Sequence, residues 1–429
     1  MEIFKLHRHK VIKFLALMAA LTFSPCILPG QEVTGDIPGD KHAGFQENII
    51  PPSPGAYQMA RYADNPVSYS LGQVDISIPL YTVKSRELEV PISLTYNTGG
   101  IKVDEIPATV GLGWSLNAGG VITKTVVGLE DDANPSNGRF RGILSHDDVY
   151  NGGYSSYLFG ILYNWYDSFW DRYTYNYNGN TGSFIVKITR GTNPTLEIEK
   201  TSVSDDKIEL EYNNIGEITK FIITDAKGIK YHFTEIESIS YDVIREPDDT
   251  SRWPQSPNYN TDSSWYLTEI VSPDETDTVI ITYTDLGEWR KKMLSHSITY
   301  TSSNELPQGW SGNNATKSVS YYIYSGCKAI ASIEFNGNIV TFDYAEHPVN
   351  LPPIDMGYSH SYYTMYIPRN NNWNKYLTSV AVKNMEGNTV WSAELESGYF
   401  GDNRLKLAGL KISGGTNGTQ PSDGYRFSY

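Results

Sequence analysis

Hydrophobic and polar residues alternate strictly in two stretches near the start of the chain, at residues 74–80 and 88–96. A period of two puts one set of side chains on each face of a strand, so the pattern predicts two half-buried β-strands. The short polar segment between them, residues 84–87, suits a hairpin turn. Pro79 and Pro91 lack a backbone N–H, so we expect each at a sheet edge or with its nitrogen facing outward.

A third alternating run covers residues 121–127, and the glycine-rich stretch GLGWSLNAGG precedes it at residues 111–120. We therefore interpret 111–120 as a connection between strands. Its glycines permit positive φ or close backbone approach, while its large apolar side chains have bulk to bury. This structural turn is assigned to Gly111, Gly113, Trp114, Leu116, Gly119 and Gly120.

Beyond residue 200 a loose motif recurs, in which an apolar strand start is followed by a turn rich in Asn, Asp or Gly and by alternating residues that end in an aromatic. The instances are residues 211–233, 267–283 with a turn at 272–277, 330–344 around 336–338, 377 onward through 384–387, and 405–429. Repetition at unequal spacing favours stacked hairpins with loops of different length. Chance alternation in a β-rich chain is the alternative.

The predicted fold class is all-β, with antiparallel hairpins in a β-sandwich-like N-terminal unit followed by repeat-like stacked hairpins. The predicted segments are a signal peptide at 1–30, an extended Pro- and Gly-containing leader at 31–56, the N-terminal β unit at 57–132, an aromatic-rich segment at 133–200, and a hairpin-repeat region at 201–429 that looks truncated.

The N-terminal pattern and the net charge indicate where the protein is located and which class of partner is disfavoured. Four basic residues precede an apolar stretch at 14–21 that is too short to span a bilayer, which is typical of an export signal. We expect a secreted, periplasmic or cell-surface protein without a membrane span in the mature chain. The net charge of −15 disfavours nucleic acid as a partner. The 32 Tyr and 37 Gly favour strands joined by tight turns.

Segment 111–120 departs from each glycine-containing functional motif. A phosphate loop needs a lysine directly after its second glycine, and the first lysine to follow is Lys124. Leu116 replaces the third glycine of a dinucleotide-binding fingerprint. A nucleophile elbow around Ser115 lacks its second glycine, which is Asn117. The structural turn is therefore the favoured interpretation.

Other reactive residue types show no catalytic or metal-binding spacing, so we expect no cofactor and no metal. The histidines lack the one-turn spacing of a zinc pair. Adjacent carboxylates at Asp131–Asp132 and Asp205–Asp206 lie near turn residues and are expected to be solvated, and Cys327 is expected to be a buried small residue.

The densest aromatic block covers residues 150–180, and residues 157–170 within it fit a short amphipathic helix. Aromatic side chains most often belong to a core. The alternative is stacking on sugars, because exported proteins meet glycans. The candidate glycan-stacking residues are Tyr163, Trp165, Tyr166 and Trp170.

Three longer stretches, residues 69–132, 175–188 and 212–233, together resemble the N-terminal region of large exported RHS/YD-repeat proteins of the Bacteroidetes type. In the third, YNNIGEITKFIITDAKGIKYHF, Tyr212, Gly216 and Ile218 match the repeat, whereas Asn213 stands where the family has aspartate. The resemblance implies a β-rich region that helps to close a shell of stacked hairpins, which in related proteins can encapsulate a toxin. It supplies no catalytic residue for this chain.

The sequence thus favours an exported, non-enzymatic structural or interaction module, the N-terminal part of an RHS-like protein without its toxin. The expected partner is a downstream RHS repeat region or another β-rich chain that pairs with an exposed strand edge. A glycan-binding adhesin is the alternative, and a hydrolase with carboxylates on separate strands is a lesser one.

Overall fold

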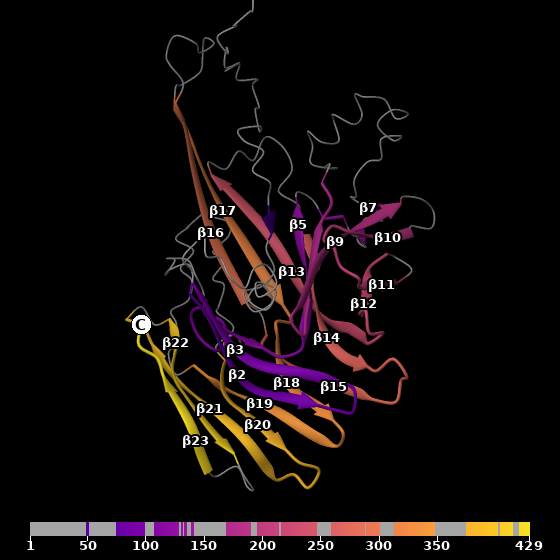
Figure 1. The fold of residues 1–429 in the computed structure, drawn as a ribbon. Coiled ribbons are helices and arrows are strands. Elements are labelled where there is room, and N and C mark those ends of the chain that lie inside the picture. Colours follow the sequence, from indigo (N-terminus) through magenta and orange to yellow (C-terminus); the bar gives the residue numbers. More distant parts are fainter. Residues whose placement is uncertain are drawn as a thin grey trace, which may run out of the picture. The chain divides into compact units, whose positions relative to one another are not determined.

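The computed structural model describes residues 49–50, 74–98, 107–127, 130–131, 133–134, 139–140, 169–189, 195–213, 216–246, 259–287, 289–300, 313–347, 375–401, 404–414 and 420–429. Every element in these ranges is a β-strand, and every pair of strands is antiparallel, which confirms the predicted all-β class (Figure 1). Residues Asn48–Tyr429 belong to one compact unit. The predicted signal peptide, almost all of the leader, and residues 157–168 of the predicted helix lie outside the described residues.

A small sheet contains β2 (Val74–Lys84), β3 (Glu89–Thr98) and β4 (Trp114–Asn117), in the order β2-β3-β4. The first two are the predicted hairpin. Pro79 lies at a register shift in the β2–β3 pairing, where a missing N–H does not interrupt a regular ladder. Pro91 pairs with Thr82 of β2, beyond the residues of β3 that pair with β4. Buried Ile78, Leu80 and their neighbours form the inner face.

The large sheet turns back on itself at β5 (Gly120–Val127). One edge of β5 pairs with β8, and the other pairs through Val121–Thr123 with β14. The strands on the β8 side are β8 (Arg172–Tyr177), β9 (Asn180–Thr189) and β10 (Thr195–Lys200), and those on the β14 side are β14 (Tyr259–Val271), β13 (Lys230–Glu246), β12 (Ile218–Thr224) and β11 (Lys207–Tyr212). The two sides pack face to face, because the ring of Tyr173 lies 5.8 Å from Phe221 and 6.0 Å from Trp265.

From β14 the same sheet continues through a series of hairpins. The strands are β15 (Thr278–Asp285), β18 (Lys328–Phe335), β19 (Asn338–Glu346), β20 (Lys375–Lys383), β21 (Thr389–Tyr399), β22 (Leu405–Gly414) and β23 (Gln420–Arg426), each paired with the next. A hairpin of β16 (Trp289–Tyr300) and β17 (Asn313–Ser325) leaves this series between β15 and β18 and pairs with β13. Three short strands remain: β1 (Ile49–Ile50), which pairs with β5, and the pair β6 (Ala133–Asn134) and β7 (Arg139–Phe140).

Three of the hairpin turns share one hydrogen-bonding pattern. In the turns that start at Asn213, Asp225 and Asn384, the backbone N–H of the first residue donates to the carbonyl four residues later, and the glycine three residues later donates back. The side-chain oxygen of each first residue accepts the N–H four residues on, at 2.9–3.0 Å. The glycines have φ between 81° and 87°, a region that other residues adopt at a cost.

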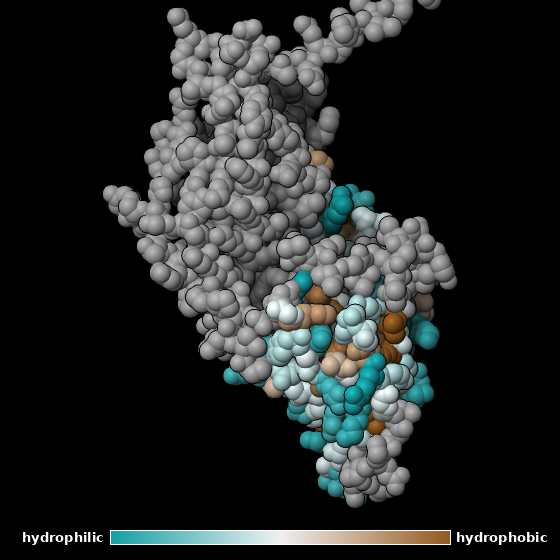
Figure 2. All heavy atoms as spheres, turned by 90° about the vertical axis from the view of Figure 1, so that its left-hand side faces the viewer, coloured by the Kyte–Doolittle hydropathy of each residue, from teal (hydrophilic) through white to brown (hydrophobic). Residues whose placement is uncertain are grey.

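One hydrophobic cluster joins the two sheets. It contains Ile78 and Val90 of the small sheet together with Val340, Val380 and Leu407 of the large one. The ring of Tyr81 lies 5.5 Å from Trp391, and Figure 1 shows β2 and β3 lying across the large sheet. Burial of apolar area here supplies the main stabilisation. On the face that Figure 2 shows, described hydrophobic residues are interspersed with hydrophilic ones.

Candidate functional site

The glycine-rich segment 111–120 lies where the small sheet meets the last strands of the large sheet. Leu112 N donates to Leu405 O at 2.9 Å, and Leu377 N donates to Thr109 O at 2.8 Å. These bonds attach the segment, and Thr109 just before it, to the starts of β22 and β20. Leu405 also pairs with Tyr399 of β21 and Leu377 with Tyr344 of β19, so each bond adds a further backbone contact to a strand that already has a partner.

Two glycines permit this close approach. A Cβ atom on Gly111 would lie 2.8 Å from Leu407 N, and a Cβ on Gly113 would lie 2.7 Å from the Tyr96 ring. Their φ values of 142° and 76° are also unfavourable for other residues. A side chain at either position would push the segment away from β22 or from β3.

The prediction of a single turn at 111–120 is wrong in one respect, because Trp114–Asn117 forms strand β4. Trp114 pairs with Tyr96 and Leu116 pairs with Leu94 of β3. The alternating apolar residues of the segment therefore belong to a strand that is hydrogen-bonded to β3. Leu116 is partly buried against the hydrophobic cluster. The two turns that remain flank β4.

The turn that follows β4 also has little room for side chains. Gly119 has φ 89°, and a Cβ there would touch Ile281 and the Tyr283 hydroxyl. A Cβ on Gly120 would lie 2.6 Å from Asn176 O, because β5 and β8 are closely paired at this point. Both glycines therefore serve close packing, in addition to the change of direction from β4 to β5.

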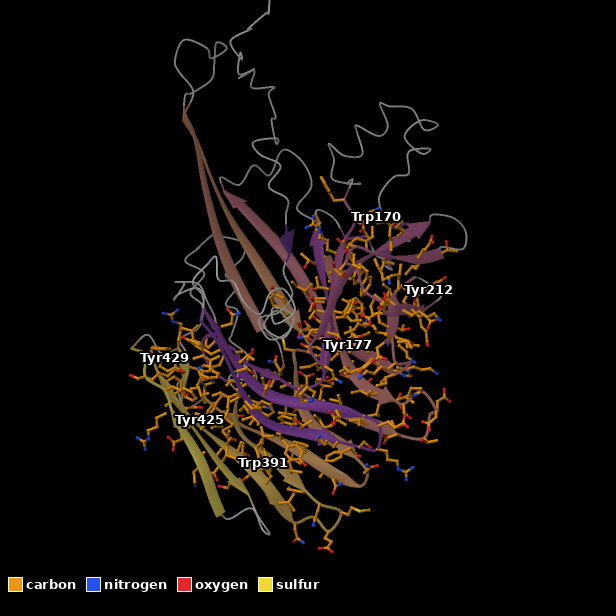
Figure 3. All side chains as sticks on the ribbon, viewed as in Figure 1. Trp170, Tyr177, Tyr212, Trp391, Tyr425 and Tyr429 are labelled. Carbon is orange, nitrogen blue, oxygen red and sulfur yellow. The ribbon has the colours of Figure 1, made fainter. Side chains whose placement is uncertain are left out.

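Four aromatic residues touch the indole of Trp114 or one of its neighbours. Together with Trp114 we name them the aromatic clamp: Tyr96, Trp114, Phe400, Phe427 and Tyr429. Ring centroids lie 5.1 Å apart for Tyr96–Trp114, 4.7 Å for Trp114–Phe427 and 5.4 Å for Phe400–Tyr429. Figure 3 shows Tyr429 within a dense group of side chains where the C-terminal strands meet the small sheet. The clamp thus joins residues from both sheets.

A chain of hydrogen bonds completes the aromatic clamp. Trp114 Nε1 donates to Tyr429 Oη at 2.8 Å, and Tyr429 Oη donates to Leu407 O at 2.6 Å. Burial raises the pKa of the Tyr429 phenol above its usual value, although the indole N–H opposes the shift. The phenol therefore stays protonated at neutral pH and acts as donor and acceptor at once. This arrangement fixes a segment in place and offers no nucleophile.

The hydroxyl of Ser115, considered above as a nucleophile, shares a hydrogen bond with Thr95 Oγ1 at 2.7 Å. Asn117 Nδ2 donates to the same Thr95 oxygen at 3.1 Å. This side-chain network links β3 and β4 on the face opposite Trp114. It is the arrangement of a cross-strand polar pair that stabilises a sheet.

Two carboxylates expected to be solvated are instead held by the protein. Asp131 is 2% exposed, and its backbone N–H donates to Asp171 Oδ2 at 3.1 Å while Asp171 N donates to Asp131 Oδ2. Asp206 accepts the hydroxyls of Tyr175 and Tyr177 at 2.6 and 2.7 Å. The turn residues near both positions led to the prediction that these carboxylates are solvated. Instead, they accept hydrogen bonds from backbone N–H and phenol groups that burial would otherwise leave unsatisfied.

A second buried polar cluster lies between β13 and β14. Glu237 is fully buried, and its Oε2 accepts the Tyr266 hydroxyl at 3.0 Å. Burial and the nearby Glu237 carboxylate raise the pKa of Tyr266 well above its usual value. Cys327 is 1% exposed, as predicted for a small buried residue. Sequence reasoning missed Glu237, because its position in β13 does not distinguish it from a surface glutamate.

Of the four candidate glycan-stacking residues, the described residues include Trp170 alone. It is partly buried and packs against the hydrophobic cluster. Tyr163, Trp165 and Tyr166 lie outside the described residues. Within the described ranges, no group of three His, Cys, Asp or Glu side chains is arranged to hold a metal ion, and no helix has the length and apolar character needed to span a membrane.

Comparison with known proteins identifies no family for this chain. No protein-family model matches the chain, and no curated protein matches it. Among solved structures, the chain is similar to the N-terminal domain of effector protein SpvB from Salmonella typhimurium strain LT2, at 13% identity and a TM-score of 0.39. The match covers 79% of this chain and 98% of that domain.

Proposed function

We propose that this chain is an exported, non-enzymatic structural module, the N-terminal part of an RHS-like protein, and that it associates with another β-rich segment through strand β23. The sequence supports export through the basic and apolar pattern of its first thirty residues. A structural role is supported by the aromatic clamp and by Ser115, Asp131 and Asp206, whose polar groups bond to neighbouring protein atoms.

The observation that carries the proposal is the geometry of β23. It pairs with β22, and Gly424, Tyr425 and Arg426 are exposed. Phe427 N donates to Ala408 O, so Phe427 and Tyr425 direct their backbone groups toward β22. Because these directions alternate along an antiparallel strand, the N–H and C=O groups of Gly424 and Arg426 point away from it. Such a row of groups is a template for a further strand.

The repeated turns support an RHS-like role. Asn213 uses its side-chain oxygen as Asp225 does in the next turn, at 3.0 and 2.9 Å. The substitution of asparagine for the family's aspartate therefore preserves the acceptor on which the turn depends. A series of such hairpins is suited to continuation by further hairpins of the same kind.

Site-specific cross-linking tests the proposal in a bacterium that exports the chain. A photoreactive amino acid in place of Arg426 should cross-link to RHS-like repeat hairpins, and Gly424→Pro in the same chain should remove the cross-link, because it deletes an outward N–H without touching the β22 ladder. The matched control carries the photoreactive group at Lys227, an exposed turn residue. Equal cross-linking from both positions, or none from position 426 in a folded chain, would contradict the proposal.

A further inference from the structure

We infer that the outward edge of β23 takes a strand of one chemical kind, in which apolar residues alternate with acidic ones. The apolar side chains of that strand extend the hydrophobic cluster, and an acidic side chain faces Arg426. The inference rests on the proposed function and deepens it, because it states the chemistry of the partner at this edge.

The inner face of the large sheet is left uncovered at β23. Leu410 of β22 is 2% exposed, whereas Tyr425, which pairs with it and therefore lies on the same face, is 44% exposed. Tyr429 is 50% exposed, and Figure 3 shows both tyrosines beside the C-terminal strands. The hydrophobic cluster thus ends in aromatic rings that are open to solvent, and exposed apolar groups of this kind mark interaction sites.

The small sheet also loses its cover at this end. Ile76 and Ile78 lie on one face of β2, and the exposed fraction rises from 5% at Ile78 to 43% at Ile76. Ile76 lies directly opposite Tyr96 in the β2–β3 ladder, and the Tyr96 ring is 6.1 Å from that of Tyr429. Apolar side chains are therefore exposed on both sheets here, which favours a partner with apolar inward residues.

The backbone of β23 decides which residues of an added strand point inward. Side chains of directly opposite residues share a face of the sheet. Residues of the added strand opposite Tyr425 and Phe427 therefore point toward the hydrophobic cluster, and those opposite Gly424 and Arg426 point to the outer face. The partner that fits this edge alternates apolar and polar residues with a period of two.

The outer face carries a positive charge at this edge. Arg426 is exposed, and within the part of the chain that the structure describes it has no ion-pair partner. The ammonium of Lys411, the other basic residue next to it on this face, lies 3.4 Å from Glu394. Opposite charges across neighbouring strands stabilise a sheet and like charges destabilise it, so the residue opposite Arg426 is acidic.

Peptide binding to the full-length chain tests the charge preference. The probe is a short, end-blocked fluorescent peptide in which valine alternates with glutamate, and lysine replaces glutamate in the comparison peptide. Salt at about 0.15 M screens the long-range field of the net charge of −15. Fluorescence anisotropy should show roughly fivefold tighter binding of the glutamate peptide. Arg426→Glu should reverse this preference.

Substitutions at the exposed tyrosines test the apolar half of the pattern. Tyr425→Ser should weaken the binding of both peptides several-fold and leave their ratio unchanged. The matched control is Tyr212→Ser in β11, which removes a tyrosine of similar exposure, 40%, and should leave both affinities unchanged. Gly424→Pro should abolish binding, because it deletes an outward N–H.

The same peptide preference in wild type and in Arg426→Glu would overturn the inference, provided that both chains have native circular dichroism. Binding that Gly424→Pro does not reduce, or no binding of either peptide to the wild-type chain, would also overturn it. A cross-link from position 426 to repeat hairpins would then still support the proposed function. Charge-selective peptide binding without that cross-link would instead reject the RHS-like partner and keep the chemistry of the edge.

Discussion

Trp114 is a residue whose burial the sequence predicts but whose hydrogen-bond partner it does not. Its bulk suggests burial, and it is 1% exposed. Its indole N–H needs a partner once buried. That partner, Tyr429, lies 315 positions away along the chain, so no local pattern identifies it. Side-chain burial was predictable here, whereas the polar contact depends on tertiary structure.

Truncation of Trp114 should destabilise the fold strongly. We expect Trp114→Ala to lower the free energy of unfolding by about 3–5 kcal/mol, as large-to-small core changes do. Trp114→Phe keeps an aromatic ring but leaves Tyr429 without the indole donor, and should lose less. Urea denaturation followed by circular dichroism measures both. An unchanged denaturation midpoint for the alanine variant would contradict the role given to the aromatic clamp.

His347 should make stability depend on pH. Its Nδ1 lies 2.8 Å from Tyr399 Oη, and its ring packs against Tyr376 and Tyr399. Burial lowers the pKa of His347 below 6.5. The unfolded chain therefore binds a proton more readily, and this stabilisation, present above about pH 6.5, is lost as the pH falls through the lowered value.

The measurement is the melting temperature of wild type and of His347→Gln between pH 8 and pH 5. The variant should show a smaller decrease toward acid pH. His232→Gln is the comparison, since burial and Lys220 lower the pKa of His232 while the adjacent Glu269 opposes that shift. A decrease of equal size in wild type and His347→Gln would refute the assignment.

At the scale of elements, the alternation of hydrophobic and polar residues predicted where several strands lie, but not which strands pair with one another. β2 and β3 were predicted with their hairpin, because a two-residue period needs no knowledge of the fold. β4 was missed, since four residues between glycines resemble a turn. The turns that start at Asn213, Asp225 and Asn384 contain Asn, Asp and Gly as expected, but their common hydrogen bonding was visible only in the structure.

The shared turn predicts how substitutions at its first residue behave. Asn384→Ala removes the oxygen that accepts the N–H groups of Glu386 and Asn388, and should cost about 0.5–1.5 kcal/mol. Asn384→Asp keeps an equivalent acceptor at the same position and should leave the free energy of unfolding nearly unchanged. Chemical denaturation of both variants tests the difference. Equal losses would mean that the side-chain oxygen does not hold the turn.

At the scale of the whole molecule, strands from different segments of the predicted domain organisation pair with one another. β5, from the predicted N-terminal unit, lies between β8 of the aromatic-rich segment and β14 of the repeat region. All three segments, as far as they are described, belong to one compact unit. Alternation shows that β5 is a strand and gives no information about its neighbours, which depend on tertiary packing.

The two sheets should also be coupled through Asp277. Its carboxylate accepts the Ser85 hydroxyl and the Glu87 N–H, the latter at 3.0 Å, so the β14–β15 turn caps the β2–β3 turn. Burial opposes ionisation of Asp277, yet these hydrogen bonds lower its pKa overall. We expect Asp277→Ala to cost about 1–3 kcal/mol, because it leaves the turn's donors unsatisfied.

A double-mutant cycle of Asp277→Ala with Ser85→Ala measures the coupling. The combined loss should be smaller than the sum of the single losses, since both remove the same contact. Strict additivity would indicate that the two turns do not interact in solution. Ser332→Ala, on the outer face of β18, serves as the uncoupled control.

The distance in sequence between Trp114 and Tyr429 has a consequence for biogenesis. During synthesis, the N-terminal side of the clamp emerges long before the tyrosine that completes it. Until then its apolar surface is available to chaperones and to neighbouring nascent chains. Proteins dominated by such non-local contacts acquire their native state slowly. Production of this protein should therefore respond to slower translation or lower temperature more strongly than its final stability would suggest.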